Sequence, residues 1–277
     1  MVHHHRPMVL CLAMSAVALG VGCHSESASS KQPSTPVDGV SATGTLGDES
    51  LSPGPSQVGT LSGSVAFAGD PIPPQTMIPI QTDPEFCAQH GADGLYPKED
   101  YLIDGDSRGI RNVIVYLMGD SLRNWSGADK EDIVIDNRNC RFQPHVHVSV
   151  VGSAVDVRNS DAVYHTTHLY GPPGFVEFNP GMRSRGDSEK TVLTRPGIYQ
   201  VKCDRHGWMS AYLRVDTHPF HAVTDEEGRF EIRGIPPGTY QVGMFHEVFR
   251  VEARDSESVS ITIQAGETAT AQLQLSG

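Results

Sequence analysis

Hydrophobic and polar residues alternate through much of the chain after residue 58, in short runs that end at Gly, Pro, Asn or Asp. Strict alternation over about four to eight residues is typical of a β-strand with one buried face. Such runs occupy 59–69, 199–203 and 258–275, and the run 111–117 is another strand, apolar enough to be buried. No stretch combines a 3.6-residue period with helix-capping residues. The sequence therefore predicts an all-β protein.

Residues 1–23 have the features of an export signal. Arg6 precedes an apolar run, 8–22, that is too short to span a membrane and suits the hydrophobic region of a signal peptide. The ending before Cys23 resembles a bacterial lipoprotein signal, which implies that Cys23 is lipidated after cleavage. The alternative is a soluble secreted protein that is cleaved nearby. We expect an exported protein, in the periplasm or at the cell surface, attached to the membrane only through this lipid.

Residues 24–58 contain mainly Ser, Thr, Pro and Gly, with almost no large apolar side chains. Such a segment buries too little surface to offset the entropy lost on ordering, so we expect a disordered tether. The 28 glycines and 19 prolines of the whole chain suit turn-rich β structure. The net charge of -12 argues against nucleic acid as a partner.

The clearest chemical motif is formed by Cys203, His206 and Met209, which follow one another at intervals of three residues. Thiolate, imidazole and thioether together suit copper, because soft sulfur holds Cu(I) and imidazole holds either oxidation state. Zinc sites rarely use Met. Such a copper site requires a second imidazole from elsewhere in the chain. His165, at the end of another strand-like run, is the candidate, and His168 is the alternative.

The residues around this motif resemble a cupredoxin with the short ligand loop of the amicyanin type. The resemblance covers roughly residues 130–216, and it is carried by Phe142-x-Pro144, Gly152, Val155-x-Val157-x-Asn159, His165, Pro196-Gly197-x-Tyr199 and Cys203-x-x-His206-x-x-Met209. It implies a Greek-key sandwich over 125–216 that holds one type 1 copper ion. The implied ligands are His165, Cys203, His206 and Met209.

Two neighbours of the implied ligands bear on how such a site would work. In many cupredoxins an Asn follows the first His and ties the two ligand loops together, and Thr166 stands at that position here. Trp208 lies two residues after His206. The resemblance implies that Trp208 belongs to an apolar docking patch around the imidazole edge, where electrons enter. The alternative for Trp208 is plain packing.

The five cysteines can be assigned in turn. Cys11 lies inside the predicted signal, Cys23 is the proposed lipid site and Cys203 is the copper candidate. Cys87 and Cys140 remain as an even pair in an exported chain, and we predict that they form a disulfide. The alternative is a pair of reduced, buried thiols. A single Cys in the ligand loop excludes a binuclear purple-copper centre, which requires two bridging thiolates.

The segments on either side of the copper motif show a second resemblance. The runs 224–230 (Thr-Asp-Glu-Glu-Gly-Arg-Phe) and 236–240 (Pro-Pro-Gly-Thr-Tyr) resemble the carboxypeptidase regulatory-like β-sandwich. This predicts a smaller sandwich built from 59–124 and 217–277, with the cupredoxin inserted in it or fused to it. The alternative is one enlarged cupredoxin whose additional strands extend its sheets.

Three functions compete for this sequence. The first is an exported type 1 copper protein that carries single electrons between redox proteins of the cell envelope. The second is a copper carrier or buffer without redox cycling. The third is a component of a copper oxidase or reductase, which requires a second copper centre with several His-x-His pairs. The chain has one such pair, His145 and His147, so we expect an electron carrier rather than an enzyme.

The remaining histidines have simpler interpretations. His145 and His147 lie on one face of a predicted strand, where the alternatives are a second metal clamp and structural side chains. His218, His221 and His246 flank the predicted smaller sandwich. The adjacent pair His246 and Glu247 lacks the spacing of a zinc peptidase, so we expect all three histidines to be structural.

Overall fold

The computed structural model describes residues 57–249 and 259–276. The predicted export signal, Cys23 and the predicted tether up to residue 56 lie outside the described residues. Strands make up nearly all of the regular structure in this part, and its named helices are two short α-helices and one 3₁₀ turn. No helix among these residues is long and apolar enough to cross a membrane. The prediction of an all-β protein is confirmed.

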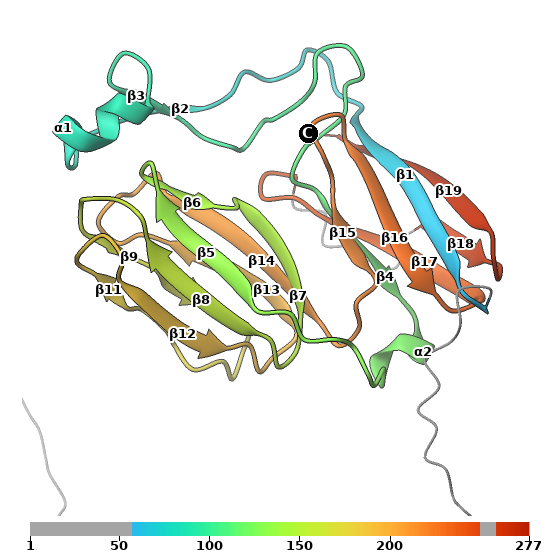
Figure 1. Cartoon of the computed structure of the whole chain (residues 1–277). Coiled ribbons are helices and arrows are strands. Elements are labelled where there is room, and N and C mark those ends of the chain that lie inside the picture. Colours follow the sequence, from blue (N-terminus) through green and yellow to red (C-terminus); the bar gives the residue numbers. More distant parts are fainter. Residues whose placement is uncertain (1–56, 250–258, 277) are drawn as a thin grey trace, which may run out of the picture. The chain divides into compact units, whose positions relative to one another are not determined.

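Eight strands between residues 133 and 216 form two four-stranded sheets, which we call the central sandwich (Figure 1). One sheet has the order β10-β13-β14-β7, formed by His168–Tyr170, Gly197–Lys202, Ser210–Asp216 and Val146–Val150. The other has the order β12-β8-β5-β6, formed by Ser188–Val192, Ala154–Asn159, Ile133–Arg138 and Arg141–Gln143. A short ladder joins β9 (His165–Thr166) to β11 (Gly181–Met182).

The core of the central sandwich follows from alternation along its strands. On β13 the side chains of Tyr199 and Val201 are buried, and on β14 those of Ala211, Leu213 and Val215. Successive side chains of a strand point to opposite faces of the sheet, so these residues share one inward face. The buried phenol of Tyr199 donates a hydrogen bond to the backbone oxygen of Arg195 (2.8 Å), which satisfies its polar atom. The predicted strand 199–203 is confirmed over most of its length.

A second pair of sheets forms what we call the flanking sandwich. One sheet has the order β16-β1-β19, formed by Arg229–Ile235, Gly59–Phe67 and Thr268–Leu275. The other has the order β15-β4-β17-β18, formed by His221–Val223, Ile114–Met118, Gly238–Phe245 and Val259–Ile263. Strands from before and after the central sandwich thus pair with one another. The central sandwich is inserted in the flanking one, and the two have separate cores, unlike a single enlarged sandwich.

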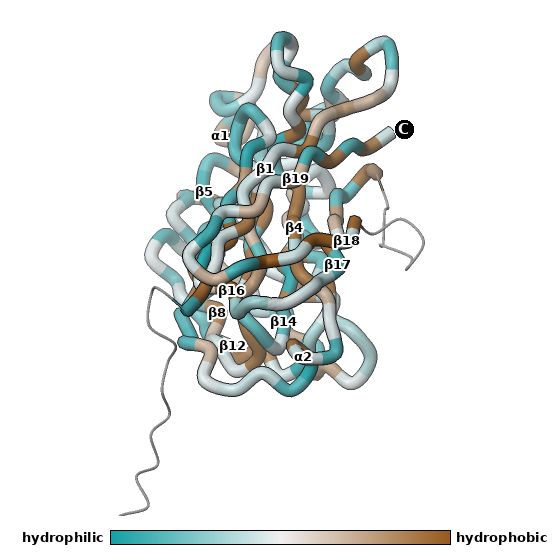
Figure 2. Tube along the Cα trace, turned by 90° about the vertical axis from the view of Figure 1, so that its right-hand side faces the viewer, coloured by the Kyte–Doolittle hydropathy of each residue, from teal (hydrophilic) through white to brown (hydrophobic). Residues whose placement is uncertain are grey.

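Strand β4 is buried, as its apolar sequence predicts, and its four consecutive buried residues show that both of its faces are covered. Its trace is coloured hydrophobic in Figure 2. Val115 and Leu117 contribute to the core of the flanking sandwich. Ile114 and Tyr116 point to the opposite face and form a small third core with Val146 of β7. The guanidinium of Arg214, on β14, lies over the ring of Tyr116 at 3.2 Å from its centroid. Helix α2 (Asp120–Arg123) follows β4.

Between β1 and β4 the chain forms a segment, 71–101, that we call the arm. It contains β2 (Met77–Pro79), α1 (Pro84–Cys87), the 3₁₀ turn Ala88–His90 and β3 (Leu95–Pro97). Its buried side chains Ile80, Cys87 and Tyr96 belong to the core of the central sandwich. Cys87 forms a disulfide with Cys140, with 5.6 Å between their Cα atoms. The predicted disulfide is confirmed, and it attaches the arm to the central sandwich.

We expect stability to fall in acid because of His246. Burial of this imidazole lowers its pKa to about 4 from 6.5; His145 adds to this shift, and the charges of Glu247 and Asp100 oppose it without reversing it. Below about pH 6.5 the unfolded chain therefore binds a proton that the folded protein excludes until about pH 4. His246 should account for a loss on the order of 3 kcal/mol as the pH falls through this window.

The measurement is urea unfolding at a series of pH values for the wild type and His246→Asn. The amide of the variant retains a hydrogen-bond acceptor for the backbone N–H of Val248, which His246 Nδ1 accepts at 3.3 Å. The free energy of unfolding should decline less steeply in the variant between pH 6.5 and pH 4. Parallel declines in the two proteins would contradict the prediction.

Candidate metal centre

The loop between β13 and β14 brings Cys203, His206 and Met209 to one end of the central sandwich. Cys203 directly follows β13, and Met209 directly precedes β14. The backbone N–H of Cys203 donates to the oxygen of Met209 (3.3 Å), and the N–H of Met209 donates to the oxygen of His206 (2.9 Å). These bonds close the loop on itself. The segment 203–209, in which the three residues lie three positions apart, therefore forms a compact turn.

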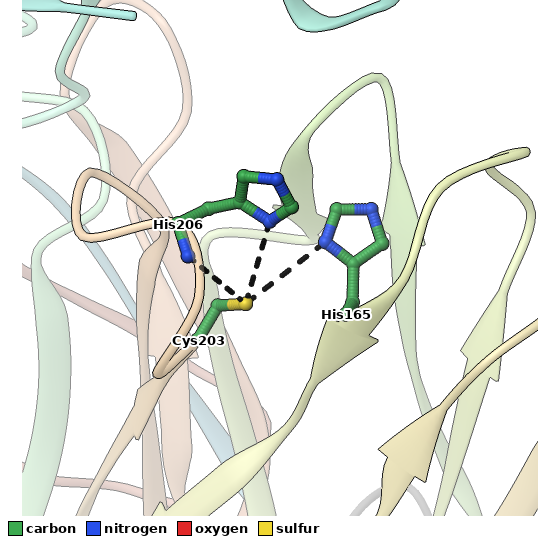
Figure 3. A group of neighbouring side chains, drawn as sticks. All are labelled: His165, Cys203 and His206. Atoms are coloured by element: carbon green, nitrogen blue, oxygen red, sulfur yellow. Dashed lines mark hydrogen bonds between the residues drawn. The ribbon is translucent and has the colours of Figure 1, made fainter. Parts of the chain in front are cut away.

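His165 reaches the same place from β9, where it pairs with Met182 of β11. Nδ1 of His206 lies 3.6 Å from Sγ of Cys203, and Nδ1 of His165 lies 4.0 Å from the same sulfur (Figure 3). The side chains are buried, with 0% of His165, 3% of Cys203 and 0% of His206 exposed. One ligand atom from each lies within 4.8 Å of the others, which is the arrangement of a metal site.

The sulfur of Cys203 is held as a thiolate. Burial by itself raises the pKa of this thiol, but hydrogen bonds from His165, His206 and two backbone N–H groups outweigh it and lower the pKa to about 5. The two N–H donors are those of Thr166 and His206, each 3.4 Å from Sγ. A thiolate is the form of Cys that binds metals. The negatively charged sulfur can therefore bind a cation without first losing a proton.

The outer nitrogen of each imidazole is bonded to a carboxylate. Nε2 of His165 donates to Asp161 Oδ2 (3.0 Å), and Nε2 of His206 donates to Asp83 Oδ2 (3.0 Å). In both rings Nδ1 is the nitrogen that faces Cys203, so a metal that displaced the proton between Nδ1 and the sulfur would meet the lone pair of Nδ1. An outer carboxylate fixes the orientation of a ligating His and makes it a stronger donor.

Asp161 is itself held firmly. It accepts the backbone N–H groups of Asn139 (2.7 Å) and Cys140 (2.8 Å), both of which have positive φ values, 58° and 55°. Burial raises the pKa of Asp161, but these bonds and the one from His165 outweigh it, so its pKa is lowered. Burial likewise lowers the pKa of His165, yet its bonds to Asp161 and Cys203 raise it overall.

Sequence reasoning missed both carboxylates. Asp161 lies four residues before His165, in the same loop, so its proximity was accessible from local spacing. Asp83 lies 123 positions before His206, in the arm. No motif or periodicity in the sequence connects those two residues, and only the folded arm brings them together.

Thr166 connects the loop that contains His165 to the loop that contains Cys203 and His206. Its backbone N–H donates to the sulfur of Cys203, and its hydroxyl accepts the backbone N–H of Asp204 at 2.7 Å. The two loops are thereby tied to each other beside the sulfur.

Of the two interpretations of Trp208, an apolar docking patch and plain packing, the structure agrees with packing and not with a docking patch. Only 6% of Trp208 is exposed. Its ring stacks on Tyr96 of the arm at a centroid distance of 5.8 Å, and its Nε1–H donates to the backbone oxygen of Cys140 (3.1 Å). The arm covers this face, so Trp208 packs in the core. Met209, the fourth predicted ligand, is also buried.

The other candidate histidines lie outside this group. His168 is on β10, and its Nδ1 is 3.3 Å from a carboxylate oxygen of Asp204. Nδ1 of His145 is 2.9 Å from the backbone oxygen of Ser210, and its Nε2 pairs with Glu247. Nδ1 of His147 bonds to the backbone of its neighbour Val148. In the described part of the chain these three belong to no group that could hold a metal ion.

The histidines of the flanking sandwich have protein partners. Nδ1 of His221 is 3.0 Å from Asp216 Oδ2, and His218 and His246 accept the backbone N–H groups of Phe220 and Val248. A second potential metal group among the described residues, Cys140, Asp161 and His165, shares His165 with the first. Because Cys140 is in the disulfide, it has no thiolate to offer. The group of His165, Cys203 and His206 is therefore the candidate metal centre.

The fold and this group define an all-β protein with a buried thiolate–imidazole site. The model of the family described as polysaccharide lyase family 4, domain II, matches residues 195–271, which is less than half of the chain. This family differs from the carboxypeptidase regulatory-like one that the sequence resembles. Comparison with curated proteins found no match.

Several solved structures of copper proteins match about a third of the chain. The Cu-containing nitrite reductase (NirK) from Thermus scotoductus SA-01 is 22% identical, with 33% of this chain and 24% of that chain covered and a TM-score of 0.29. The purple cupredoxin from Nitrosopumilus maritimus is 27% identical, with 32% and 100% covered and a TM-score of 0.27. A mutant of amicyanin in the Cu(I) form is 21% identical, with 37% and 98% covered and a TM-score of 0.28.

Proposed function

We propose that this protein is a cupredoxin-type electron carrier that binds one copper ion. The observation that carries the proposal is the convergence of a buried thiolate, Cys203, and the Nδ1 atoms of His165 and His206. Two imidazoles and one thiolate are the donors of blue-copper electron-transfer sites, in which a Met is a weak axial ligand. Met209 is proposed as that axial ligand.

The separations suit a single shared ion. A metal–sulfur bond of about 2.3 Å and a metal–nitrogen bond of about 2.0 Å together reach about 4.3 Å. The sulfur-to-nitrogen distances of 3.6 and 4.0 Å fall below this limit. Structural zinc sites usually have four Cys or His ligands, and this group offers three. The donor set therefore fits copper better than structural zinc.

The surrounding residues keep the donors in place without an ion. The closed loop fixes Cys203 and His206, Thr166 ties that loop to β9, and two carboxylates orient the imidazoles. Bound copper would supply a one-electron couple at this site. Side chains that are already oriented need to move little when the charge of the site changes by one. Such a site suits a carrier of single electrons.

The proposal extends to location and partners. We propose that the protein is exported, lipid-anchored through Cys23, and exchanges electrons with redox proteins of the cell envelope. The Cys87–Cys140 disulfide supports export, because disulfides persist in oxidising compartments. We propose an oxidase or reductase role only as a lesser alternative, because it requires several His-x-His pairs and the sequence has one, His145 and His147.

The test is to load the protein with Cu(II) and record its visible and electron paramagnetic resonance spectra, followed by spectroelectrochemical titration. We expect an intense thiolate-to-copper absorption band and reversible one-electron reduction. His165→Gln should abolish the band, whereas the matched variant His168→Gln should retain it, because His168 lies outside the group. A wild-type protein that binds only Cu(I) and stays colourless would support the copper-buffer alternative instead.

A further inference from the structure

The arm reaches the candidate metal centre through one carboxylate, that of Asp83. Its Oδ2 accepts the hydrogen bond from Nε2 of His206. The same carboxylate pairs with Arg205, with Nε 2.8 Å from Oδ2 and Nη2 2.9 Å from Oδ1. Asp83 therefore joins a buried imidazole to a guanidinium at the surface. The side chain of Asp83 is 23% exposed and that of Arg205 is 44% exposed.

The backbone holds Asp83 in this position. Asp83 precedes α1 in the left-handed region, with φ 46° and ψ 47°. Its backbone oxygen accepts the N–H groups of Phe86 (3.1 Å) and Cys87 (2.9 Å). The disulfide then fixes Cys87 to the central sandwich. Left-handed backbone at a residue other than Gly is uncommon and persists where surrounding contacts impose it.

The Asp83–Arg205 pair would affect the charge around a copper ion bound at the candidate metal centre. A carboxylate on the outer nitrogen makes the imidazole a stronger donor and favours a higher positive charge at the metal. Arg205, bonded to the same carboxylate, offsets part of that effect. Asp161 acts similarly on His165, but it is deeply buried and also binds two backbone N–H groups, so changing it would disturb the loop.

We propose that Asp83 is a positioning residue of the metal centre, and that the Asp83–Arg205 pair sets its reduction potential. Asp83 keeps Nδ1 of His206 directed at Cys203, and its negative charge stabilises the oxidised form. The arm thus contributes a functional residue to the site, although it lies outside the central sandwich. This inference rests on the proposed copper function.

The test is the reduction potential of the copper-loaded protein, measured for the wild type and three variants. Asp83→Asn retains the shape and a hydrogen-bond acceptor, and Asn tolerates left-handed backbone. It should raise the equilibrium constant for reduction by about tenfold, which is 59 mV for one electron. Arg205→Gln should shift the potential in the opposite direction. The matched control Glu85→Gln removes a charge from the same helix without touching His206, and it should leave the potential unchanged.

A combined Asp83→Asn and Arg205→Gln variant separates charge from packing. If charge decides, the opposite shifts should largely cancel in this variant. Should Asp83→Asn not fold or not bind copper, Arg205→Gln decides alone, and an unchanged potential would overturn the inference. A wild type with the thiolate-to-copper band and unshifted variants would overturn only this inference. A wild type without the band would overturn the proposed function as well.

Discussion

Cys203→Ser protein, treated with copper under conditions that saturate the wild type, will lack the intense visible absorption. The band requires a thiolate, and the pKa of about 5 means that Cys203 provides one at neutral pH. A serine hydroxyl keeps its proton there and is a poor ligand for copper. Copper affinity should fall by more than the roughly 10- to 100-fold that loss of an outer hydrogen-bond partner costs. Visible spectroscopy and a competition titration with a copper chelator measure the two effects.

The control for this variant is its folded state. Far-ultraviolet circular dichroism should match the wild type, because the sheets do not depend on the sulfur. Retention of an intense copper-dependent band in folded Cys203→Ser protein would contradict both the ligand assignment and the proposed function.

Removing the disulfide with Cys87→Ala and Cys140→Ala together will lower the free energy of unfolding by about 2–5 kcal/mol. The bond joins residues 53 positions apart, so it restricts a long loop of the unfolded chain. It also anchors the arm, whose Tyr96 covers Trp208. Denaturant unfolding measures the first effect. A red shift of tryptophan fluorescence under native conditions would report the loosened arm.

Chemical reduction provides the matched comparison. A disulfide reductant should lower the stability of the wild type by a similar amount and leave the double variant unchanged, since Cys203 is the one free thiol among the described residues. Equal unfolding curves for the wild type and the double variant would contradict the assigned role of this bond.

Much of the fold was accessible from local patterns. Alternation predicted the strand around Tyr199 and Val201, and the apolar run predicted that β4 is buried. These predictions succeed because side chains alternate across a strand, so burial leaves a two-residue period in the sequence. The motif of candidate metal ligands could be recognised in the sequence for a similar reason. Cys203, His206 and Met209 lie in one short loop, whose backbone bonds join residues that are close in sequence.

The position of the arm could not be predicted from such local patterns. Its sequence has little periodicity, and its path is set by contacts with residues far along the chain, such as Cys140 and Trp208. For this reason the sequence left the two interpretations of Trp208 open. A tryptophan beside a ligand loop suits either an exposed patch or a covered core, and the choice depends on whether another segment packs on it.

By itself the sequence determined that the protein is built of strands, that Cys203 and His206 share one loop, and that Cys87 has a partner in Cys140. Tertiary structure alone decided that the imidazoles of His165 and His206 turn Nδ1 toward the sulfur, with Asp161 and Asp83 on their outer nitrogens. The physical reason is the distance along the sequence over which each feature is determined. Strand periodicity and loop spacing are recorded over a few neighbouring residues, whereas the orientation of a buried ring depends on hydrogen-bond partners that folding brings from distant positions.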